Sequence, residues 1–141
     1  MTVSSAVRRC ALSPASAADL ARRTLRAEGV RDAVVSLAFV GRRRIRSLNH
    51  RYLGHDRETD VLAFALPGAG GVVVGDIYCS PDAAARAARR YGVTEREELR
   101  RLVVHGVLHV LGHDHPEGDG RTRSAMWRRQ ETLLRRLGDA P

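Results

Sequence analysis

The chain has 141 residues, a hydrophobic fraction of 43% and a charged fraction of 28%, which are typical of a globular domain and exclude intrinsic disorder. No apolar run reaches the roughly 18 residues that a membrane span requires, and none follows Arg8 and Arg9, so neither a membrane protein nor a secretory leader is expected. The net charge of +8 favours a polyanionic partner such as RNA or DNA, although all the basic residues are arginines, a bias that a GC-rich genome also produces.

Two cysteines, Cys10 and Cys79, lie far apart in the sequence and fit no CxxC pattern. Unpaired cysteines are typical of the reducing cytoplasm, where thiols are rarely oxidised to disulfides. We therefore expect a cytoplasmic protein with two structural thiols.

Capping residues, glycines and hydrophobic periodicity divide the chain into strands and helices. The predicted strands cover residues 3–9 at a sheet edge, 33–40, 61–66 and 72–78. The predicted helices cover residues 14–28, 42–54, 81–92, 94–111 and about 121–137. This order predicts an α+β fold, in which helices pack against a small mixed four-stranded sheet, as a single domain over residues 1–141.

The predicted helix over residues 42–54 has an apolar and a basic side. Ile45, Leu48 and Tyr52 recur at i, i+3 and i+7, so we expect them to share one buried face. The arginines on the remaining surface are Arg42, Arg43 and Arg46. Such a cluster can bind an RNA backbone, and a solvated helix face is an equally good interpretation.

The segment HGVLHVLGHDH, residues 105–115, has the spacing of a metal site. His105 and His109 are four residues apart on a predicted helix, so both imidazoles project from one side of it. Gly112 ends the helix and lets the chain turn back, which can bring His115 to the same ion. Three neutral imidazoles leave a fourth position for water, as in catalytic zinc sites.

The segment has other interpretations as well. A histidine pair alone is more often a surface feature, and three imidazoles also accept nickel or copper. His113 is expected to point away, whereas Asp114 is a candidate to orient a ligand. Zinc proteases carry a glutamate directly after the first histidine of HExxH, and here that position is Gly106, so protease activity is not expected.

HGVLHVLGHDH closely resembles the HGxLHLxGYDH signature of the YbeY family, the bacterial rRNA maturation endoribonucleases. LNHRYLGHDRETDVLAFAL (48–66), GDIYCS (75–80) and MWRRQETLL near the C-terminus are similar to further family segments in the same order. The resemblance covers residues 32–137 approximately. It implies a zincin-like metal helix, one zinc ion per chain on His105, His109 and His115, and endonucleolytic cleavage of single-stranded RNA. It also implies roles in 3′-end maturation of small-subunit rRNA and in ribosome quality control.

The chain departs from the family at one position that matters for catalysis. The family commonly carries an activity-linked arginine directly after the tyrosine of the middle segment, and this chain has Leu53. Arg51 and Arg57 flank Leu53 and are the candidates to present a guanidinium to phosphate. Asp60 is a candidate general base, together with Asp114, and a purely structural role for Asp60 is left open.

Two hypotheses of function follow. The first is a zinc-dependent endoribonuclease, and the second is a non-catalytic, zinc-containing ribosome-assembly factor. Both have single-stranded RNA and the small ribosomal subunit as partners, and a small-molecule metal hydrolase is a third class. The aromatic fraction of 4% does not indicate a base-stacking platform. The sequence leaves the cleavage site, the native metal and the oligomeric state open.

Overall fold

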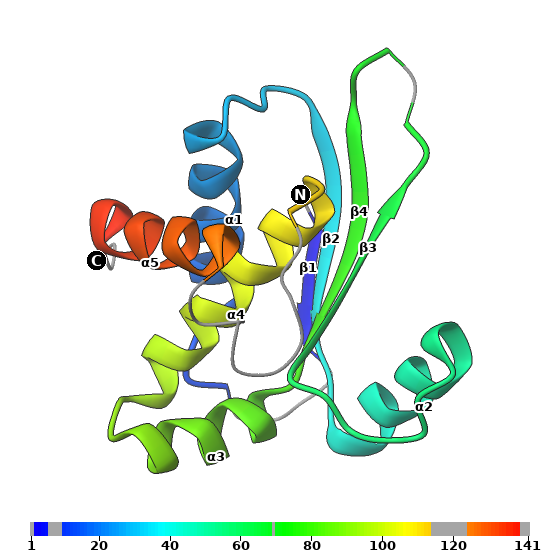
Figure 1. Ribbon diagram of the computed structural model, residues 1–141, viewed down its shortest axis with the longest axis vertical. Helices are drawn as coiled ribbons and strands as arrows, with labels where there is room; N and C mark the ends of the chain where they lie inside the picture. The colour runs from blue at the N-terminus through cyan, green and yellow to red at the C-terminus, as the bar shows by residue number, and fades with distance from the viewer. Residues whose placement is uncertain (1, 6–9, 69, 114–123, 139–141) are drawn as a thin grey trace.

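The computed structural model of the chain describes residues 2–5, 10–68, 70–113 and 124–138. It shows a small α+β domain with a mixed sheet, as the order of predicted elements indicated (Figure 1). The elements of the described residues are β1 (Thr2–Ser5), α1 (Pro14–Ala27), β2 (Ala33–Phe39), α2 (Arg42–Leu53), β3 (Val61–Leu66), β4 (Val73–Cys79), α3 (Pro81–Tyr91), α4 (Glu95–Val110) and α5 (Ala125–Leu137).

The strands form one sheet in the order β1-β2-β4-β3. β1 and β4 both run parallel to β2, whereas β3 runs antiparallel to β4. The three longer strands pair along their whole length, and the short strand β1 lies at the β2 edge. Of the edge strand predicted over residues 3–9, the described part is residues 3–5, and residues 6–9 lie outside the described ranges.

Local capping explains where the helices begin. Ser13, Ser80, Thr94 and Ser124 each accept a hydrogen bond from a backbone N–H of the first turn, which satisfies a donor that has no partner inside the helix. At Thr94, the Glu97 N–H donates to the threonine hydroxyl across 3.0 Å. The starts of α1, α3 and α4 were therefore predictable from single residues, whereas the last helix was predicted from about residue 121 and begins at Ala125.

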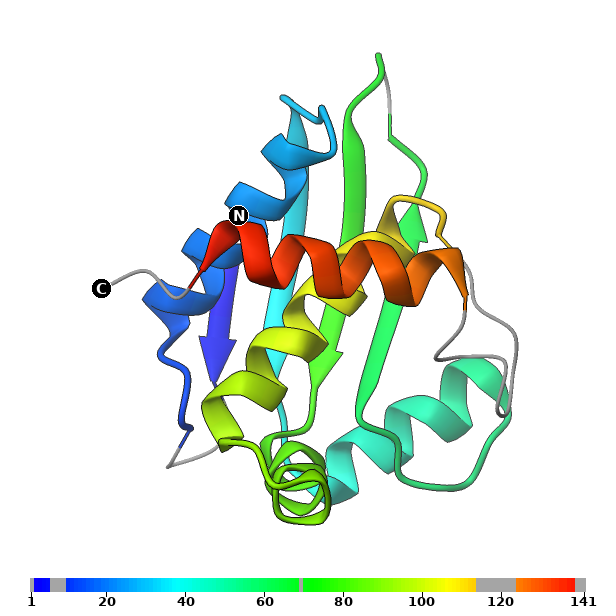
Figure 2. The same cartoon turned by 60° about the vertical axis from the view of Figure 1, so that its left-hand side comes forward.

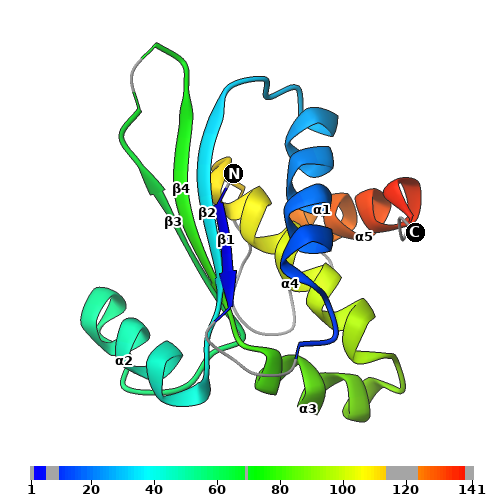
Figure 3. The same ribbon diagram turned by 180° about the vertical axis from the view of Figure 1, so that it is seen from behind.

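The two faces of the sheet are covered by different helices, as Figures 1 and 3 show. On one face, alternate side chains of β2 and β4, including Leu37 and Ile77, pack in the main core with α1 and α4. On the other face, Ile45 and Leu48 of α2 pack against Leu62 of β3. The prediction that Tyr52 is buried with them was wrong. Tyr52 is 57% exposed, because the last turn of α2 extends beyond the sheet (Figure 1).

Helix α4 lies at the centre of the molecule. It packs on β3 and β4, while α1, α3 and α5 contact its other sides, and Figure 2 shows α5 crossing over it. A Cβ atom on Gly106 would lie 2.6 Å from Cγ2 of Ile77, and one on Gly75 would lie 2.6 Å from Cγ1 of Val110. These two glycines therefore allow α4 to lie directly on the sheet.

More residues of α4 are buried than its hydrophobic periodicity indicates. The hydrophobic periodicity of this helix indicates a buried stripe of Leu99, Leu102, Val103, Gly106 and Val110; these residues are buried, and so are Val104, Val107 and Leu108 on the remaining sides. No helix of the described ranges is long and apolar enough to cross a membrane.

Candidate functional site

His105 and His109 lie side by side on the last two turns of α4. Their ring centroids are 4.7 Å apart and the ring planes meet at 74°. His105 is 5% exposed, and His109 is half-buried. Two of the three predicted ligands are thus adjacent to each other, at the end of a rigid and deeply packed helix.

Gln130 of α5 holds the His105 ring. Nδ1 of His105 lies 2.7 Å from Oε1 of Gln130, and both side chains are buried. An amide oxygen only accepts hydrogen bonds, so Nδ1 carries the proton and the lone pair is on Nε2. Metal-binding histidines are typically oriented by such a partner on their other nitrogen. This orientation fits His105 as a metal ligand.

The hydrogen bond between His105 and Gln130 belongs to a larger polar network. Nε2 of Gln130 donates to Glu131 across 3.0 Å, and Nε of Arg101 donates to the same carboxylate across 3.0 Å. Arg101 also bonds to Glu98, one turn earlier on α4. Sequence reasoning missed Gln130, although it occupies the buried side of α5 between Met126 and Leu133, where a polar residue is unexpected.

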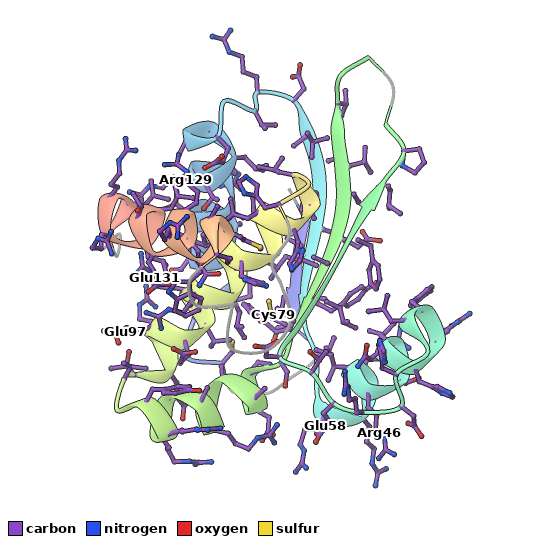
Figure 4. All side chains as sticks on the ribbon, in the orientation of Figure 1. Arg46, Glu58, Cys79, Glu97, Arg129 and Glu131 are labelled. Atoms are coloured by element: carbon purple, nitrogen blue, oxygen red, sulfur yellow. The ribbon has the colours of Figure 1, made fainter. Side chains whose placement is uncertain are left out.

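The third predicted ligand, His115, lies outside the described residues, as does Asp114. Within the described ranges, no group of three His, Cys, Asp or Glu side chains is placed to hold a metal. Nε2 of His113 lies 3.7 Å from the carboxylate of Glu28, the residue that follows α1, and this carboxylate also accepts a hydrogen bond from Arg129 of α5 across 2.5 Å. Arg129 is labelled in Figure 4.

A pocket of about 490 Å³ is lined by His105, the first residue of the histidine pair, and by other residues of α3, α4 and α5. His105 and Asp60 both line it, so the structure brings the predicted ligand and the candidate general base to one cavity. Asp60 precedes β3, and its Oδ1 accepts a hydrogen bond from the Val61 N–H across 2.8 Å, while its backbone carbonyl accepts one from the Ser80 N–H. Asp60 therefore also supports the local fold.

The predicted RNA-binding arginines lie on α2, on the opposite face of the sheet. Nε of Arg42 lies 2.5 Å from Glu58, and Nε of Arg46 lies 2.9 Å from Asp56; Figure 4 labels Arg46 and Glu58. The guanidinium groups lower the pKa values of these two carboxyl groups, mainly through the hydrogen bonds. Arg43 is exposed and forms no ion pair with the part of the chain that the structure describes.

The structure does not bring the other candidate arginines to the pocket. The guanidinium of Arg51 lies 5.6 Å from the centroid of the Tyr52 ring, and Arg57 is exposed in the segment after α2. Neither they nor the α2 arginines named above line the pocket that holds His105. Leu53, at the position of the family's arginine, is 51% exposed.

The two cysteines are free thiols. Burial raises the pKa of Cys79 far above its ordinary value and raises that of Cys10 to a smaller extent. Cys79 points into the core between the sheet and α4 (Figure 4). Because both thiols stay protonated, they are poor nucleophiles and poor metal ligands.

Comparison with known proteins identifies the family of the chain. Residues 7–138 match the family described as Endoribonuclease YbeY. A protein of that name from Pelotomaculum thermopropionicum is 45% identical over 125 residues, which cover 83% of this chain and 81% of the relative. One from Carboxydothermus hydrogenoformans is 45% identical over 116 residues, or 82% and 79% of the two chains.

A solved structure shares the fold as well. The solution structure of TM1509 from Thermotoga maritima matches with a TM-score of 0.64 and 26% identity, covering 96% of this chain and 87% of the other. These matches confirm the resemblance that the histidine segment first indicated. The chain belongs to the Endoribonuclease YbeY family.

Proposed function

We propose that this protein is a zinc-dependent endoribonuclease that cleaves single-stranded RNA in the cytoplasm. Its role would be 3′-end maturation of small-subunit rRNA and ribosome quality control, with the small ribosomal subunit as partner. The observation that carries the proposal is the adjacent pair His105 and His109, with Nδ1 of His105 held by Gln130. The activity named for the relatives and the net charge of +8 support an RNA substrate.

In this proposal His105, His109 and His115 hold the zinc ion. When bound, zinc supplies Lewis-acid chemistry, which polarises a phosphoryl oxygen and makes water a stronger nucleophile near neutral pH. Gln130 keeps the ring of His105 oriented with its Nε2 lone pair available. The carboxylate of Asp60, in the same pocket as His105, accepts a proton from the attacking water.

A specific observation favours the second hypothesis, a non-catalytic zinc-containing assembly factor. Leu53 replaces the arginine that the family uses, and none of the five candidate arginines lines the pocket. The arginine that does line it, Arg101, is bonded to Glu98 and Glu131. Under this hypothesis zinc mainly stabilises the fold and the protein binds RNA without cutting it.

One comparison of variants separates the two hypotheses. Zinc content and cleavage of a single-stranded RNA are measured for the wild type, His109→Ala and the matched control His113→Ala, after rigorous removal of host nucleases. We expect one zinc ion per chain and cleavage for the wild type and His113→Ala, and loss of both for His109→Ala. Equal residual cleavage by wild type and His109→Ala would exclude the nuclease hypothesis and leave only the hypothesis of a non-catalytic assembly factor.

A further inference from the structure

The pocket beside His105 has an apolar wall and a polar end. The wall is made of Ala87, Tyr91, Val93, Leu102 and Trp127. The polar end is made of Asp60, Glu98, Arg101, His105 and Gln130. Its volume of about 490 Å³ falls within the range of small-molecule sites, which are mostly apolar with a few polar groups that fix orientation.

Two aromatic side chains on the wall are accessible from solvent. Tyr91 is 65% exposed and Trp127 is half-buried. Aromatic rings in such positions bind single-stranded nucleic acid by stacking on its bases, because every base presents a π-face. The low aromatic fraction of the chain did not indicate this, because the two rings come from α3 and α5 and line the same pocket only in the folded protein.

The charges of the pocket disfavour a phosphate as its occupant. Asp60 and Glu98 are carboxylates, and the guanidinium of Arg101 is already bonded to Glu98 and Glu131. Like charges at a binding site cost affinity. A carboxylate instead accepts hydrogen bonds from amino groups, which adenine and cytosine carry on their exposed edges.

We infer that this pocket binds one nucleobase of the single-stranded RNA substrate, with a preference for a base that bears an exocyclic amino group. The base stacks against Trp127 and Tyr91, and its amino group donates to the Glu98 carboxylate. This inference rests on the proposed function, because the pocket shares His105 with the metal site. The bound base would then hold the adjoining phosphate beside the histidine pair.

Trp127 is the single tryptophan of the chain, so its fluorescence reports directly on the pocket. The metal-free protein is titrated with adenosine monophosphate, with uridine monophosphate and with ribose 5-phosphate, which has no base. We expect saturable quenching by adenosine monophosphate, weaker binding of uridine monophosphate and no response to ribose 5-phosphate. An equal response to ribose 5-phosphate, or no saturable response to either nucleotide, would overturn the inference.

A variant that fills the pocket provides the second test. Ala87→Phe places a ring in the cavity, and Ala85→Phe, on the same helix but away from the pocket lining, is the matched control. We expect Ala87→Phe to weaken the binding of a short single-stranded RNA about ten-fold, the size of one lost stacking contact, and Ala85→Phe to bind normally. If circular dichroism shows that Ala87→Phe does not fold, Tyr91→Ala replaces it, because that side chain is exposed. Wild-type affinity in the folded pocket variant would contradict the proposed base site.

Ligand binding to the pocket and RNA cleavage are measured separately, so failure of this inference can be distinguished from failure of the proposed function. RNA cleavage without any change in Trp127 emission overturns the base pocket and leaves the nuclease. A base-dependent Trp127 response without zinc-dependent cleavage supports the pocket and overturns the nuclease. An RNA with a single abasic position should bind about ten-fold more weakly if the base comes from the RNA chain, and equal binding of all abasic variants would overturn the assignment to RNA.

Discussion

Nδ1 of His105 and Oε1 of Gln130 lie 2.7 Å apart, in the interior where α4 and α5 cross. The bond joins residues 25 positions apart in the sequence, so the packing of α5 on α4 decides how the His105 ring is turned. Arg101 and Glu131 extend the bond to the surface of the same two helices (Figure 4 labels Glu131). The packing of α5 on α4 thus sets the orientation of His105, a candidate metal ligand.

Replacing Gln130 by leucine should weaken zinc binding without unfolding the protein. Leucine has a similar volume but no acceptor, so Nδ1–H of His105 loses its partner and the ring loses its fixed orientation. Loss of such a partner typically lowers metal affinity by about 10–100-fold. Zinc affinity is measured by competition with a chromophoric chelator. Gln130→Glu keeps an acceptor for Nδ1–H but loses the donor to Glu131, so it should bind zinc more tightly than Gln130→Leu, and unchanged affinity in Gln130→Leu would show that the bond does not support a metal site.

Gly106→Ala should destabilise the fold although alanine favours helices. The new Cβ would lie 2.6 Å from Cγ2 of Ile77, which belongs to a stiff β-branched side chain. Overpacking costs about 1–3 kcal/mol and the gain in helix propensity returns about 1 kcal/mol, so we expect a net loss of about 1 kcal/mol in the free energy of unfolding by urea. In an Ile77→Ala background the same change should cost less. An equal cost in both backgrounds would rule out this contact as the cause.

Gly106 also shows how far the sequence alone can be taken. Because glycine has no carboxylate, Gly106 excluded the zinc-protease pattern. The sequence did not show that a glutamate side chain at position 106 would point at the sheet. Helix ends were predictable because their causes are local, as at Thr94 and at Gly92, whose φ of +68° is left-handed. The spacing of His105 and His109 predicted their adjacency for the same reason.

The features that the sequence did not predict depend on contacts between distant segments. Tyr52 has the helical spacing of a buried residue, and its ring centroid lies 5.5 Å from that of Phe64 on β3, yet the side chain stays 57% exposed at the end of α2. Arg42 was predicted as a candidate RNA-binding residue on a basic helix face, and the fold places Glu58 beside it. Gln130 acquires its role only when α5 crosses α4. Periodicity identifies a buried side of a helix but does not identify which partner covers it.

Restoring an arginine at position 53 should increase RNA cleavage. Leu53 is half-exposed at the end of α2, so Leu53→Arg needs no repacking of the core. An arginine can bind phosphate oxygens through two parallel hydrogen bonds, whereas a lysine acts as a point charge. We expect kcat/KM on single-stranded RNA to rise at least ten-fold, about 1.4 kcal/mol, for Leu53→Arg and by less for Leu53→Lys. Equal rates for wild type and both variants would show that this position does not limit catalysis.

Asp60→Asn separates the chemical role of Asp60 from its structural role. The asparagine Oδ1 can still accept the hydrogen bond from the Val61 N–H, and the backbone bond to Ser80 is unaffected, so we expect a folded protein that binds zinc normally. An amide cannot accept the proton that the proposed mechanism assigns to the carboxylate, and general-base catalysis contributes about 10²–10⁴-fold. Single-turnover cleavage should therefore fall by at least 100-fold, roughly the lower end of that range, with KM nearly unchanged.

Asp60→Ala, which also removes the acceptor for Val61, should in addition lower the melting temperature. Retained cleavage in Asp60→Asn would remove Asp60 from the chemistry and leave it the structural role that its bonds at the start of β3 already support.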